Sequence, residues 1–127
     1  MASRHEVMVA LRDHTAAVCV QLAVNAQANL IEATPVDLGW ARANWLPSLG
    51  SPVVTVSGSP EAIDPAAPAN AMAAVLAFRL EDGAIFVSNN VPYIRRLDAG
   101  SSTQAPAGFV RKAIAAAILD AGNGRLA

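Results

Sequence analysis

The first 33 residues predict one long helix, and this helix limits what the rest of the chain can fold into. Ser3 is placed to cap its N-terminus, and Glu6, three residues further on, completes the pattern of a capping box. Pro35 disfavours helical geometry at Thr34 and has no amide hydrogen to continue the helix, so we expect the helix to end near Ala33. Every later element must therefore help to cover this helix.

The predicted helix is apolar on two opposite sides. One side consists of residues spaced three and four apart, Val7, Leu11, Val18 and Leu22. The other side, about 200° away at 100° per residue, consists of Val9, Val20, Val24 and Ile31. Such a helix must be covered twice, so we expect one side to pack on its own domain and the other on a neighbouring subunit. The alternative is that both sides lie inside one small domain.

After this helix the chain changes to short elements separated by turn residues. Residues 45–49 can form an extended strand, and residues 84–88 are the more convincing strand, because they are apolar, β-branched and bounded by turn signals. Prolines and glycines make residues 51–69 a long loop or arm, in which only residues 53–56 look strand-like. A short helix is expected over residues 69–80.

The C-terminal third predicts two further helices. Pro92 suits the first turn of a short helix that runs through Asp98 and ends at Gly100. A final helix follows Gly108 and is expected to end at residues 123–124. The sequence therefore predicts one α+β domain over residues 1–127, with a long N-terminal helix packed with a small antiparallel sheet, short helices and a C-terminal helix.

The chain is unusually poor in charge. Hydrophobic residues make up 54% and charged residues 15%, whereas an average soluble domain has about 25% charged residues. One interpretation is that neighbouring subunits cover much of the apolar surface. The alternative is an alanine-rich chain whose surface side chains are simply small.

The charge balance and the single cysteine exclude several kinds of partner and site. A net charge of −1 gives no electrostatic basis for binding nucleic acid or a membrane surface. Cys19 is the only cysteine, so the chain has no internal disulfide and no cysteine-based zinc site, which fits a reducing cytoplasm. The uncharged run over residues 15–31 contains four amide side chains, so we expect a soluble helix and no membrane span.

No residue pattern predicts catalysis. His5 and His14 lie about 180° apart around the helix, so they cannot bind one ligand, and Asp13 points away from His14. Glu61 and Asp64 lie in a proline-rich loop without further ligands, as solvated carboxylates do. The chain has no phosphate-binding glycine loop, zinc motif or nucleophile elbow. We therefore expect no enzyme activity, no cofactor and no metal.

Two segments resemble the neck and tail-completion (tail-terminator-like) proteins of long-tailed bacteriophages. In that family a long N-terminal helix precedes a Thr-Pro-Val-Asp-Thr-Gly-Arg-like motif and an Asn-Trp strand, and here residues 34–45 read TPVDLGWARANW. The family's Asn-Asn-Xaa-Pro-Tyr, Leu-Xaa-Xaa-Gly-Xaa-Ser and Gln-Ala-Pro-Xaa-Gly elements are similar to residues 89–93, 97–102 and 104–108. The chain departs from the family at Leu38 and Trp40, where Thr and Arg are common. The departure at Trp40 puts in doubt a charged role at that position.

The resemblance implies a viral structural protein and a place in the virion. It implies a ring, expected to be a hexamer of this chain, at the head-proximal end of the tail, assembled in the bacterial host cytoplasm. Its partners would be the tail tube protein and the head-tail connector or head-closure protein, and genome DNA would pass through the lumen without specific binding. A heterologous contact between copies generates such a ring when the rotation closes.

The resemblance and the residue chemistry together suggest an interface set. Asp37 would fix the turn after the helix together with Gly39, and Arg42 would bridge to a carboxylate nearby or on the next subunit. The aromatic anchors are Trp40 and Trp45, because buried aromatic and arginine residues dominate interface energetics. The remaining members are the helix residues and those of the second segment: Val20, Val24, Ile31, Tyr93, Arg95 and Arg96. Tyr93 is expected to pack its ring on the core with its hydroxyl bonded, and the two arginines to face solvent or a partner.

Two other functions stay open. The nearest alternative keeps the phage setting and makes the chain a head-closure or stopper component of the neck, which a long loop plugging the lumen would favour. A small cytoplasmic enzyme or adaptor of similar build is the more distant alternative. A pocket that joins His14 to a carboxylate and opens to solvent would favour the enzyme.

Overall fold

The long N-terminal helix forms as the capping residues predict. The computed structural model describes residues 1–100 and 106–122. Helix α1 spans Arg4–Ala33, and the Ser3 hydroxyl and the Glu6 side chain form the reciprocal capping box. At the other end, the Thr34 hydroxyl donates to the Leu30 carbonyl at 2.7 Å, where Pro35 stops the helix. Both helix ends are thus fixed by local side chains.

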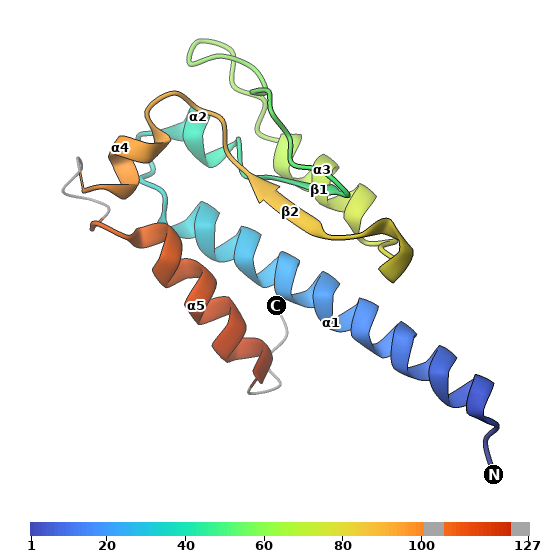
Figure 1. Cartoon of the computed structure of the whole chain (residues 1–127). Coiled ribbons are helices and arrows are strands. Elements are labelled where there is room, and N and C mark those ends of the chain that lie inside the picture. Colours follow the sequence, from blue (N-terminus) through green and yellow to red (C-terminus); the bar gives the residue numbers. More distant parts are fainter. Residues whose placement is uncertain (101–105, 123–127) are drawn as a thin grey trace.

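A two-stranded antiparallel sheet lies against the C-terminal half of α1 (Figure 1). Strand β1 is Leu46–Leu49 and strand β2 is Ile85–Ser88, in a register that opposes Leu46 to Ser88. Helix α3, Ala67–Val75, packs on β1, and the short 3₁₀ helix η1, Leu80–Asp82, leads into β2. The α+β class is therefore confirmed, with a sheet of two strands among the described residues.

Helix α5, Phe109–Gly122, packs along α1 on the side away from α3 (Figure 1). The short helices α2, Gly39–Arg42, and α4, Ile94–Asp98, lie at the C-terminal end of α1. The Asp98 carboxylate accepts from the Val110 amide at 3.0 Å, so it caps the first turn of α5. The predicted helix end at residues 123–124 lies outside the described residues.

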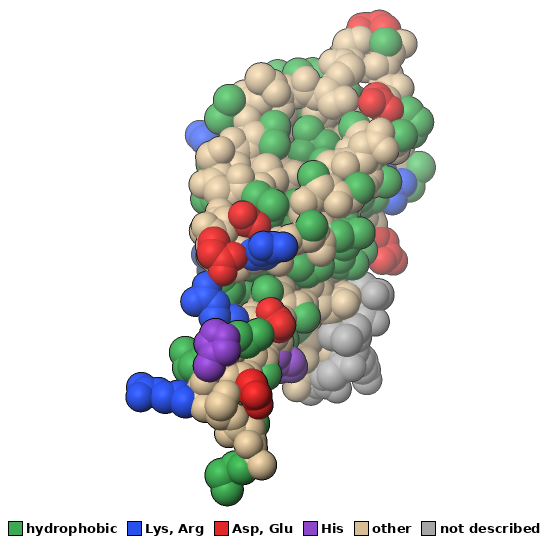
Figure 2. All heavy atoms as spheres, turned by 90° about the vertical axis from the view of Figure 1, so that its right-hand side faces the viewer, with side chains coloured by type: hydrophobic (Ala, Val, Ile, Leu, Met, Phe, Trp, Pro, Cys, Tyr) green, Lys and Arg blue, Asp and Glu red, His purple; other side chains and the backbone are tan. Residues whose placement is uncertain are grey.

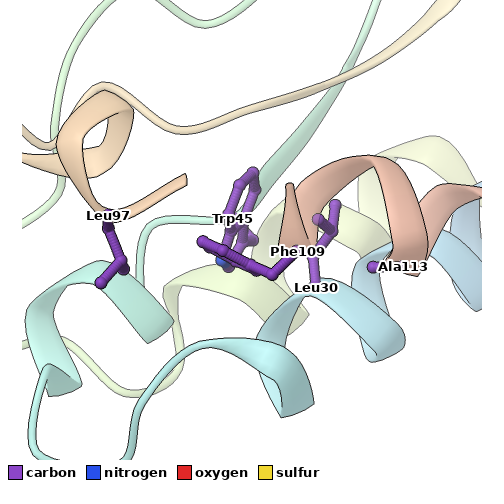
Figure 3. Packing of buried hydrophobic residues seen from close by; sticks show 5 residues of the cluster. All are labelled: Leu30, Trp45, Leu97, Phe109 and Ala113. Carbon is purple, nitrogen blue, oxygen red and sulfur yellow. The ribbon is translucent and has the colours of Figure 1, made fainter. Parts of the chain in front are cut away.

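The core forms where α1, α5 and the sheet meet. One cluster consists of Leu30, Trp45, Leu97, Phe109 and Ala113, which come together from the helices α1, α4 and α5 and from the turn before β1 (Figure 3). A second cluster, Ala23, Met72 and Val75, joins α1 to α3. Both clusters contact only the second half of α1, so the first half of the helix is left outside the core.

Two predicted elements differ from the structure. Residues 53–56 form no strand, because their backbone has no neighbouring strand to pair with and instead offers carbonyls to the Asn90 side chain. The helix predicted over residues 69–80 begins earlier, at Ala67, and ends at Val75. Pro68 suits the first turn, where an amide hydrogen is not needed. The loop is therefore limited to residues 51–66, which we call the arm.

Candidate assembly site

The two segments that carry the family resemblance meet in the folded chain. The Asn89 side chain donates to the Ala41 carbonyl at 2.9 Å, across 48 residues of sequence. Within the first segment, the Trp45 indole donates to the Thr34 hydroxyl at 2.9 Å, and both side chains are buried. The bond between Trp45 and Thr34 joins two buried side chains and the one from Asn89 is part-buried, so the two bonds fix the geometry at this end of α1. We call this meeting point, formed by residues 34–45 and 89–98, the motif junction.

Trp40 and Tyr93 form the aromatic part of the motif junction. Their ring centroids lie 6.3 Å apart with the planes tilted by 59°, a separation typical of interacting aromatic pairs. Burial raises the pKa of Tyr93 above its ordinary value of 10.0, and a hydrogen bond with the Ala41 backbone opposes that shift. Both rings are half-buried, so they support the junction and keep an edge at the surface.

Arg42 and Gly39 have roles other than those expected. The Arg42 guanidinium donates from Nε to the Ile31 carbonyl at 3.0 Å, so it satisfies a carbonyl at the end of α1. Gly39 is the first residue of α2 and has no positive φ. A Cβ at Gly39 would lie 3.2 Å from the end of the Ile63 side chain, so the arm lies close to this glycine. Asp37 lies exposed in the turn between α1 and α2, as expected.

Several residues expected at an interface lie in the core of their own chain. Trp45 is 5% exposed and packs in the main cluster, so the expectation of a surface anchor there is wrong. Ile31 packs against the same cluster, and Val24 packs against the second one. Both sides of the second half of α1 are thus covered by its own domain, which is the alternative that the sequence left open. Arg95 and Arg96 lie exposed on α4.

The arm is bonded to the motif junction near its middle. The Ser57 carbonyl accepts from the Trp40 indole at 2.9 Å and from the Asn44 amide at 3.1 Å, and the Ser57 amide donates to Asn44 at 2.7 Å. Asn90 adds a bond to the Val53 carbonyl at 2.7 Å. Beyond this attachment, residues 60–66 are all exposed. The arm therefore has a fixed base and an exposed tip.

The first half of α1 projects beyond the rest of the molecule (Figure 1). Val7, Leu11 and Val18 are 46%, 56% and 41% exposed, although they form one apolar side of the helix. Figure 2 shows charged and histidine side chains gathered around this projecting end. We call residues 4–17 of α1 the overhang. An apolar stripe on an exposed helix indicates a surface that another molecule covers.

By length and composition alone, α1 is also apolar enough to cross a membrane. Its second half, however, is tied to the domain by buried amide groups. The Gln27 side chain donates to the Trp45 carbonyl at 3.1 Å and to the Pro68 carbonyl at 2.9 Å, and Asn29 donates to the Ala113 carbonyl. Such bonds to three other segments are typical of a helix at the centre of a folded domain.

An apolar groove of about 560 Å³ runs beside the second half of α1, between β2 and α5. Its floor and walls include Leu22 and Ala26 of α1, Val87 of β2, and Ile114 and Ile118 of α5. Among the residues that the structure describes, no charged side chain lines it. Ile118 is 59% exposed at its rim. The groove and the overhang are the two uncovered apolar surfaces that α1 helps to form.

A second cavity, of about 650 Å³, has the opposite character. It lies nearer the N-terminus of α1, beside η1, and its lining includes Val20, Arg12, Asp13, Arg79 and Glu81. Arg12 and Glu81 form an exposed ion pair at 2.6 Å, a kind of pair that contributes little to stability. His14 does not line this cavity, so the arrangement that would favour an enzyme is not found there. Within residues 1–100 and 106–122, no three metal-ligating side chains gather.

No family model, curated protein or solved structure matches this chain. Its function must therefore be argued from its own surfaces. Sequence reasoning missed the structural roles of two buried amide side chains, Gln27 and Asn44, because an amide residue fits the same helix or turn pattern whether it is buried or exposed. It also missed the groove, which is formed by elements that are distant in sequence. The spacing of Ile114 and Ile118 was the only signal of it.

Proposed function

We propose that this chain is a structural protein of a long-tailed bacteriophage that assembles into a ring, expected to be a hexamer, at the head-proximal end of the tail. The ring completes the tail tube and joins it to the head-tail connector. It acts by binding and carries out no bond chemistry. Its partners are further copies of this chain, the tail tube protein and a connector protein.

The observation that best supports this proposal is the motif junction. Two of the segments that resemble the phage family, residues 34–45 and 89–93, meet here: the Asn89 side chain donates to the Ala41 carbonyl, and Trp40 and Asn90 donate to backbone carbonyls of the arm. Residues that recur together in a family and also meet in space indicate one shared structural task. That task here is to hold the end of α1, the arm and α4 in a fixed arrangement from which surfaces can be presented.

The large total exposed surface of the chain agrees with assembly. A compact monomer of 13.1 kDa exposes about 6,400 Å². This chain exposes 7816 Å², an excess of roughly 1,400 Å². A standard interface buries about 800 Å² on each partner, so a ring subunit with two neighbours would cover about 1,600 Å². The excess is thus of the size that a ring would bury.

A head-closure or stopper protein is the second candidate, and the arm favours it. Residues 60–66 are exposed beyond a firmly bonded base, which is the build of a loop that reaches into a lumen. Replacing residues 60–63 with a shorter linker separates the two candidates. A tail-completion ring would still join heads, whereas loss of a stopper loop would let DNA leak from filled heads.

Light scattering of the purified chain, alone and with tail tubes, tests the proposed function. The expected result is a particle of six times 13.1 kDa, about 79 kDa, free or bound to tube ends. Tubes of an unrelated tail protein serve as the control, because a specific ring should not bind to their ends. A chain that stays monomeric and ignores both kinds of tube would contradict the proposal.

A further inference from the structure

We propose that the overhang of one copy docks in the apolar groove of a second copy, and that this helix-to-groove contact joins neighbouring subunits. The inference rests on the proposed ring and assigns its subunit contact. The two surfaces lie on different parts of the same chain, so the contact is head-to-tail and leaves a free overhang and a free groove at each step. Contacts of this kind close into rings or continue as filaments.

The lengths of the two surfaces agree. The overhang covers residues 4–17, which at 1.5 Å per residue is about 20 Å of helix. The groove follows α1 from Cys19 to Leu30, about 17 Å by the same rise. One surface is therefore long enough to fill the other.

The chemistry of the two surfaces also agrees. The overhang offers two aliphatic side chains, Val7 and Leu11, which lie one turn apart and are about half exposed. Arg4 and His14 lie next to them on the same side of the helix, so in the contact they must stay in water at the two ends of the groove. The described residues that line the groove are small, aliphatic or aromatic and carry no charge. An amphipathic helix that places its apolar side in a hydrophobic groove is a common mode of recognition.

The amount of exposed surface favours a second copy over a small apolar ligand. A ligand in the groove would leave the overhang uncovered, and most of the excess of roughly 1,400 Å² would stay in water. A second copy covers both surfaces with one contact. Each subunit of a ring would then bury its overhang on one side and its groove on the other.

Two substitutions break the contact from its two sides. Leu11→Lys puts a charge on the overhang, and Ile118→Lys puts one at the groove. Both side chains are more than half exposed, at 56% and 59%, so neither change should unfold the chain. Leu119→Lys, at a 62% exposed site of α5 that belongs to neither surface, is the matched control. Circular dichroism and urea unfolding of all three variants verify the fold.

A mixing experiment then tests the inference, under the condition in which the wild-type chain assembles. Each variant alone should be monomeric by light scattering, and the control should assemble as wild type. Mixed one to one, Leu11→Lys and Ile118→Lys should form a dimer and nothing larger, because only one intact overhang and one intact groove remain. Assembly by either variant alone, or no association in the mixture, would overturn the helix-to-groove contact.

The single cysteine provides a second measurement that needs no substitution. Cys19 lines the groove, so an occupied groove should slow its reaction with a thiol reagent at least about tenfold, since bound side chains exclude the reagent. An assembled ring with unprotected Cys19 would overturn the inference and leave the proposed function standing. A chain that remains monomeric even with tail tubes would instead contradict the proposed function itself.

Discussion

Replacing Gln27 with leucine tests whether α1 belongs to the centre of this domain. The substitution makes an apolar helix more apolar, and glutamine and leucine have similar helix propensity. From the sequence alone it should be neutral or stabilising. In the folded chain, however, the Gln27 amide is the donor to the buried carbonyls of Trp45 and Pro68, at 3.1 Å and 2.9 Å.

The expected loss follows from those two bonds. A buried carbonyl left without its donor costs about 1–3 kcal/mol, and the extra apolar burial of leucine offsets about 1 kcal/mol of the total. Because two carbonyls lose their donor, we expect Gln27→Leu to lower the free energy of unfolding by about 1–5 kcal/mol. For a domain of this size that corresponds to a melting temperature lower by roughly 4–20 °C.

Urea unfolding followed by tryptophan fluorescence measures this loss, because Trp45 lies beside Gln27 in the core. Ala28→Leu is the control, since it adds a leucine at the next, exposed position of α1 without removing a hydrogen bond. The control should change the free energy of unfolding by less than about 0.5 kcal/mol. A Gln27→Leu variant as stable as wild type would refute the tie between α1 and the domain, and would favour α1 as a membrane helix.

Three further predictions concern the motif junction, the arm and α5. Tyr93 is the only tyrosine, so the absorbance of tyrosinate follows the titration of this residue alone. The midpoint of that titration should lie above pH 10.0 in the folded chain. Because folding raises the pKa of Tyr93, the contribution of the neutral phenol to the free energy of unfolding is full below pH 10 and is lost as pH rises through the folded pKa. The Tyr93→Phe variant should not show this loss. Gly58→Ala should speed proteolysis of the arm several-fold, because Gly58 has φ +63° and an added Cβ would lie 2.4 Å from the Ala62 carbonyl oxygen. Gly39→Ala should leave the rate of proteolysis unchanged, because the Cβ added there would meet only the end of a side chain. Asp98→Ala should cost about 1 kcal/mol in thermal unfolding by removing the cap of α5, and an unchanged melting temperature would exclude that role.

The two ends of α1 and the strand β2 could be predicted because their causes are local. A capping box acts within four residues, Pro35 affects its neighbours directly, and residues 84–88 combine an apolar, β-branched run with turn signals on each side. The same holds for the α+β class, which follows from the order of such elements. The family resemblance adds the phage proposal, which stays a prediction until the mass of the assembled chain is measured.

The tertiary structure alone decided how α1 is used. Helical spacing shows two apolar sides, which predicts that different molecules cover the two sides along the whole helix. The domain instead covers both sides of the second half of α1 and neither side of the first half. The reason is length: 30 residues make a helix of about 45 Å, and the elements that follow are too short to reach along all of it. Burial of Gln27 and Trp45, attachment of the arm at Ser57 and the groove beside α5 likewise depend on contacts between distant segments, which helical spacing and turn chemistry do not encode.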